Sequence, residues 1–87
     1  MKTFSSITKY STLFMVITDN ENNPKIIRFT PEKVYQSADD KIVIKLPNGI
    51  KAKFNPNISM AHLETKNYTQ YIFTERDMAE KFFKSIK

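Results

Sequence analysis

The chain has 87 residues, of which 40% are hydrophobic and 26% charged, a composition typical of a globular protein and a length that excludes two domains of ordinary size. We therefore expect one domain over residues 1–87. The lack of cysteine excludes disulfide scaffolds, thiolate nucleophiles and zinc sites with cysteine ligands, while the net charge of +5 favours an anionic partner.

The first apolar segment, Thr12–Thr18, predicts a central β-strand. Both of its alternating faces are apolar, one with Leu13, Met15 and Ile17 and the other with Phe14 and Val16. A strand of this kind is buried on both sides of its sheet. The apolar run is much shorter than the roughly 20 residues that span a bilayer, so we expect a cytoplasmic protein without a membrane partner.

A hairpin and a further strand are expected after this segment. Residues 19–24 are polar and rich in turn-forming types, and Lys25–Phe29 resumes a β-prone pattern. Thr30 and Pro31 would suit the start of a short helix. Val34–Gln36 nevertheless favours a strand, because its residue types have a high β-propensity.

The strongest hairpin signal is Pro47-Asn48-Gly49, between the predicted strands Lys41–Leu46 and Ile50–Phe54. A two-residue loop would place lysines opposite isoleucine and leucine, and would mix charged with apolar side chains on each face. A three-residue loop with Gly49 in the left-handed conformation gives one wholly apolar face. It pairs Leu46 with Ile50, Ile44 with Ala52 and Ile42 with Phe54, and this is the register that we predict.

An amphipathic helix is predicted from about Glu75 to the C-terminus, directly after a strand over Asn67–Thr74. The segment Ser59–Thr65 before that strand would also suit a strand. Thr74 and Asp77 form a capping-box-like pair. Apolar residues then recur with the helical period at Met78, Ala79, Phe82, Phe83 and Ile86. Together the elements predict an α+β fold, an antiparallel sheet or small barrel of five to six strands packed by the C-terminal helix.

The second face of the predicted hairpin is rich in lysine. It carries Lys41, Lys45, Lys51 and Lys53, with Lys45 directly opposite Lys51. Like charges that face each other across two strands are destabilising unless water or an anion screens them. The pattern predicts contacts with the phosphates of RNA or single-stranded DNA, assisted by Arg28 or a tyrosine.

The alternative interpretation is a solvated strand face that binds nothing. Twelve of the fourteen cationic residues are lysine, and residue types with AT-rich codons are abundant, so codon bias contributes to the lysine content. Charge runs are usually soluble surface, and lysines on strands also discourage aggregation. The sequence leaves both interpretations open.

No residue pattern indicates catalysis, a metal or a cofactor. Gly49 is the only glycine, which excludes the glycine-rich loops that bind dinucleotides and nucleoside triphosphates. His62 is the only histidine, and beside Glu64 it lacks the further ligands or acid–base partners that such sites need. Asp39-Asp40 lacks the spacing of an EF-hand loop and is interpreted as a turn.

We therefore expect a small binding protein that is not an enzyme and has no small-molecule substrate. Nucleic acid is the expected partner. The alternative is a protein-binding inhibitor or modulator of a host factor, such as a phage-encoded anti-defence protein, that pairs through an exposed strand edge. The sequence does not determine the partner, the choice between RNA and DNA, or the oligomeric state.

Overall fold

The elements of the fold follow the order expected from the sequence. The computed structural model describes residues 2–19, 23–47, 49–64 and 67–86. In chain order they form η1 (Phe4–Ser6), β1 (Leu13–Asp19), β2 (Lys25–Phe29), β3 (Lys33–Gln36), β4 (Ile42–Lys45), β5 (Lys51–Phe54), β6 (Met60–Glu64), β7 (Tyr68–Phe73) and α1 (Arg76–Ile86). The α+β class and the strand at Val34–Gln36 are confirmed. Residues 20–22 of the predicted β1–β2 loop lie outside the described residues.

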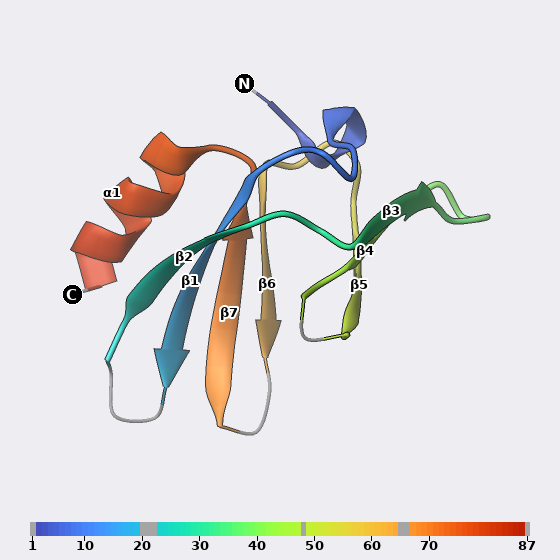
Figure 1. Cartoon of the computed structure of the whole chain (residues 1–87). Helices are drawn as coiled ribbons and strands as arrows, with labels where there is room; N and C mark the ends of the chain where they lie inside the picture. Colours follow the sequence, from blue (N-terminus) through green and yellow to red (C-terminus); the bar gives the residue numbers. More distant parts are fainter. Residues whose placement is uncertain (1, 20–22, 48, 65–66, 87) are drawn as a thin grey trace.

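The strands form two antiparallel sheets, with the orders β2-β1-β7-β6 and β3-β4-β5 (Figure 1). The prediction of a single sheet or small barrel with five to six strands is therefore wrong, because the described residues form seven strands in two open sheets. The physical reason lies in β1. Both of its faces are apolar, and one helix covers only one of them, so a second sheet covers the other.

Helix α1 covers one face of the four-stranded sheet (Figure 1). Its apolar stripe is the predicted one and packs around Val16 and Phe73. The ring centroid of Phe82 lies 4.5 Å from that of Tyr71 and 5.5 Å from that of Phe73. Within the described part of the chain, no helix is both long and apolar enough to cross a membrane.

The main core lies between the two sheets. The four-stranded sheet contributes Leu13, Met15 and Ile72, and the three-stranded sheet contributes Ile44 and Phe54, all of which are buried. The three-stranded sheet therefore turns its apolar face inward, which leaves its other face for polar side chains.

The N-terminal segment completes this core, a role that its sequence does not indicate. Phe4 is fully buried, and its ring stacks on that of Phe54 with the centroids 4.7 Å apart. Its backbone N–H donates to the carbonyl of Ile58 (2.9 Å). The hydroxyl of Thr74, predicted to cap the helix, instead donates to the carbonyl of Lys2 (2.6 Å). An isolated aromatic residue in a polar segment carries no periodic signal, so only the tertiary contacts reveal its place.

We predict that Phe4→Ala lowers the free energy of unfolding by about 3–5 kcal/mol, because it leaves a cavity beside Phe54. Urea denaturation followed by circular dichroism measures the change. Tyr10→Ala is the control in the same segment, since Tyr10 is 81% exposed, and it should change stability by less than about 0.5 kcal/mol. Equal, small effects of both changes would show that the segment does not belong to the core.

Candidate nucleic-acid interface

The predicted register of the β4–β5 hairpin is confirmed. Ile42 pairs with Phe54, Ile44 with Ala52 and Lys45 with Lys51. The N–H of Leu46 donates to the carbonyl of Ile50 (2.8 Å). Gly49 has φ +88°, a conformation that glycine adopts without steric cost. Asn48, the middle residue of the predicted turn, lies outside the described residues.

Strand alternation sorts the hairpin into an apolar inner face and a lysine-rich outer face. Ile44 and Ala52 are buried in the core, whereas Lys51 and Lys53 are exposed. Lys41 continues the outer face one residue before β4, where its carbonyl accepts the N–H of Ser37 (2.8 Å). The four predicted lysines therefore share one face.

Strand β3 adds a fifth lysine. Lys33 lies opposite Lys45, which lies opposite Lys51, so three lysines form one row across all three strands. Lys33 was not among the predicted site residues, because its place on this face depends on the pairing of the Val34–Gln36 strand with Lys41–Leu46. The polar turn between the two segments is compatible with a hairpin but does not specify this pairing.

Strand β3 also brings an aromatic ring to this face. Tyr35 lies opposite Val43, which lies opposite Lys53. These three residues form the next row on the same face as the three lysines. Tyr35 is 41% exposed, whereas Val43 is buried. We call this set the lysine face; it consists of Lys33, Tyr35, Lys41, Lys45, Lys51 and Lys53.

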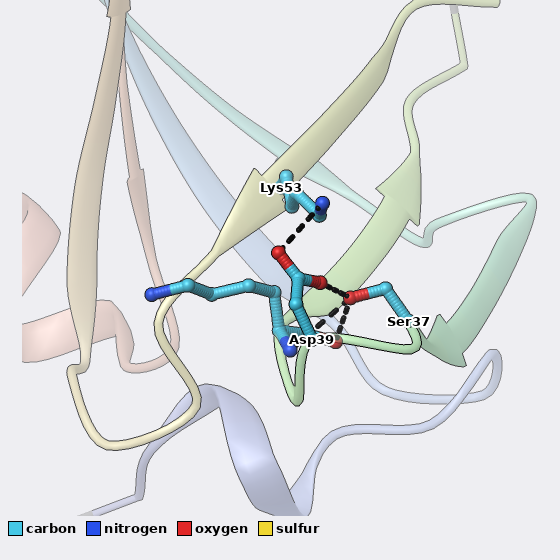
Figure 2. Close-up of polar contacts among 4 residues, drawn as sticks. Ser37, Asp39 and Lys53 are labelled. Carbon is cyan, nitrogen blue, oxygen red and sulfur yellow. Dashed lines mark hydrogen bonds and ion pairs between the residues drawn. The ribbon is translucent and has the colours of Figure 1, made fainter.

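Two of the four predicted lysines form ion pairs. The ammonium of Lys53 lies 2.9 Å from the carboxylate of Asp39 (Figure 2), and that of Lys45 lies 3.6 Å from the carboxylate of Glu32. All four side chains are well exposed to solvent, and exposed ion pairs contribute little to stability. Among the described residues, the other three lysines of the face form no ion pair.

Asp39 lies in the β3–β4 turn and is held from two sides (Figure 2). The hydroxyl of Ser37 donates to one carboxylate oxygen and the ammonium of Lys53 to the other. These contacts lower the pKa of Asp39 from 3.8 to about 2, with the Ser37 hydrogen bond as the larger cause. The turn itself agrees with the prediction, and Asp40 adopts a positive φ of 62°, which aspartate tolerates in turns.

We predict that Asp39 titrates near pH 2 when followed by NMR. The depressed pKa means that the stabilisation from its charged form is present above the unfolded-state pKa and is lost as the pH falls from about 4 towards 2. Ser37→Ala and Lys53→Gln should each raise the pKa of Asp39, since the first removes a hydrogen bond to the carboxylate and the second removes the neighbouring positive charge. An unchanged titration in both variants would contradict this account of the turn.

The structure does not bring Arg28 to the lysine face. Arg28 is on β2, opposite Phe14, in the four-stranded sheet. Its side chain lines a hollow together with Arg76 of α1. The prediction that Arg28 assists these lysines therefore lacks a geometric basis, because the two sets belong to different sheets.

The lysine face can hold an anionic chain by charge and a planar ring by stacking on Tyr35. Elsewhere, His62 is exposed on β6, with its ring centroid 6.0 Å from that of Tyr71. The described residues contain no group of three histidine, aspartate or glutamate side chains placed to hold a metal. Comparison of the chain with protein-family models, curated proteins and solved structures gave no match.

Proposed function

We propose that this protein binds single-stranded nucleic acid, RNA or DNA, on the lysine face. The row of Lys33, Lys45 and Lys51 is the observation that carries this proposal. Neighbouring strands lie about 4.8 Å apart, so the backbone positions of the three lysines fall within about 10 Å of one another. Like charges this close disfavour the folded state. A polyanion turns that repulsion into attraction and releases its counterions when it binds.

Two features favour a single strand over a duplex. Tyr35 exposes an aromatic ring beside the lysines, and such rings stack on unpaired bases in proteins that bind single strands. Helix α1 is the only α-helix among the described residues, and its apolar stripe is buried against the four-stranded sheet. It is therefore poorly placed to enter a major groove as recognition helices do.

The carboxylates of Glu32 and Asp39 act as internal competitors for phosphate in this proposal. Each occupies one lysine of the face in the free protein. Because both pairs are exposed and weak, a phosphate group displaces the carboxylate at little cost.

The double substitution Lys45→Glu/Lys51→Glu should weaken binding of a fluorescent oligo(U) RNA at least tenfold at low salt. A single-strand complex with five lysine–phosphate contacts has a log–log salt slope of about −3.5, and losing two contacts reduces it by about 1.4. Fluorescence anisotropy across a salt series measures both quantities, and a duplex of the same length tests the preference for single strands.

The matched control is Lys81→Glu/Lys84→Glu on the exposed side of α1, which makes the same change in net charge, from +5 to 5 − 4 = +1. It should retain a salt slope close to that of the wild type. Equal losses in both double variants would show that binding follows net charge alone. Absence of binding at low salt in the wild type would overturn the proposal and favour a protein partner.

Asp39→Asn should strengthen binding by roughly two- to fivefold, the range expected for releasing one exposed ion pair. Asp40→Asn is the control in the same turn, because it removes the same charge while Asp40 accepts a hydrogen bond from Gln36 and forms no ion pair with a described lysine. A comparable gain in both variants would show that the effect of Asp39 is long-range charge and not competition for Lys53.

A further inference from the structure

Strand β2 presents a sheet edge with two exposed isoleucines, Ile26 and Ile27, between Lys25 and Arg28. It ends the four-stranded sheet and pairs only with β1, so alternate backbone N–H and C=O groups point away from its partner. Its neighbouring residues Ile26 and Ile27 are 38% and 42% exposed. At the β5 edge, by contrast, Lys51 and Lys53 alternate along the strand, a device that discourages strand pairing.

A hollow lies beside β2 on the inner face of the sheet. It has a volume of about 170 Å³, and Ile27 and Phe29 form one wall while Leu46 and Pro47 of the other sheet form the opposite wall. The lining is apolar apart from Gln70. A space of this size holds one apolar side chain, since apolar cavities of about 150 Å³ already admit a benzene molecule.

A second hollow lies on the other face of the same strand. It has a volume of about 250 Å³ and is lined by Phe14, Ile26, Arg28, Arg76 and Glu80. The guanidinium of Arg76 lies over the Phe14 ring, 5.8 Å from its centroid. Within the described residues neither arginine forms an ion pair. The lining thus holds two guanidinium groups and only one carboxylate, that of Glu80. This excess of positive charge suits a carboxylate from a ligand, which arginine binds through two parallel hydrogen bonds.

Strand alternation links the two hollows. Ile27 lies opposite Met15 and faces inward, whereas Arg28 lies opposite Phe14 and faces the helix side. A strand added beside β2 would alternate in the same way, with one side chain directed towards the apolar hollow and the next towards Arg28.

We propose that the β2 edge binds an extended segment of a partner protein by strand addition, and that this segment alternates apolar with acidic residues. Its backbone supplies the missing hydrogen bonds, and its alternate side chains fill the two hollows. Arg28 and Arg76 beside the strand favour an acidic segment, whereas a second copy of β2 would bring further cations to an edge that already carries Lys25 and Arg28. This edge belongs to a different sheet from the lysine face, so neither proposal depends on the other.

The first test uses a blocked seven-residue peptide of alternating valine and glutamate as the probe. Titration followed by ¹⁵N NMR should show one-to-one binding, with the largest shifts at β2 amides and slower hydrogen exchange there. The same peptide with alternate N-methylated backbone groups should bind at least tenfold more weakly, because it cannot complete the ladder. A peptide with lysine in place of glutamate should also bind at least tenfold more weakly.

Two substitutions test the separate hollows. Ile27→Lys places a charge at the apolar hollow and should lower the affinity for the glutamate peptide at least tenfold. Arg28→Glu should lower the affinity for the glutamate peptide and raise the affinity for the lysine peptide. Misfolding cannot produce such a reversal. Lys45→Glu/Lys51→Glu should leave peptide affinity within about twofold at about 0.15 M salt, where exposed charges on separate surfaces are screened.

Three outcomes would overturn this proposal. The first is no shift at β2 amides with the glutamate peptide at millimolar concentration. The second is equal affinity for the N-methylated peptide, which would exclude strand addition. The third is a concentration-dependent dimer in ultracentrifugation that is lost in Ile27→Lys, which would identify a second copy of the chain as the occupant.

Discussion

The fold depends on the need to bury both faces of β1. Leu13 and Val16 point to opposite sides of this strand, and both are fully buried. Each such side chain contributes about 1.5–3 kcal/mol when it leaves water, so neither face can remain open. Helix α1 covers the Val16 side and the three-stranded sheet covers the Leu13 side. The lysine face is the solvent side of that covering sheet.

The same burial requirement sets where the charges of the hairpin lie. A slip of one residue between β4 and β5 would turn the lysines into the core, where an unpaired ammonium costs several kcal/mol. Packing requires only that the outer face be polar, and it does not require three lysines in one row. Core packing therefore does not explain the row of Lys33, Lys45 and Lys51.

Only the part of the candidate site that lies on the β4–β5 hairpin was predictable from the sequence. The hairpin turn and its alternating pattern place Lys45 opposite Lys51 without any distant contact, and the structure has this pairing. Lys33 and Tyr35 join the face through the β3–β4 pairing, which a polar turn of ordinary composition does not specify. The ion pair between Lys53 and Asp39 joins residues fourteen positions apart. The positive charge of Arg28 carries no information about which sheet its strand joins, and the structure places it in the other sheet.

The sequence by itself determined the α+β class, the central strand β1, the β4–β5 register and the apolar stripe of α1. Each of these follows from periodicity or turn chemistry within a short stretch of chain. The tertiary structure alone decided that seven strands divide into two sheets, that Phe4 stacks on Phe54, and that two hollows of opposite character flank β2. These features depend on contacts between residues far apart in the chain. The free energy of such contacts comes from apolar surface that two distant segments bury together, and the sequence of either segment alone does not show it.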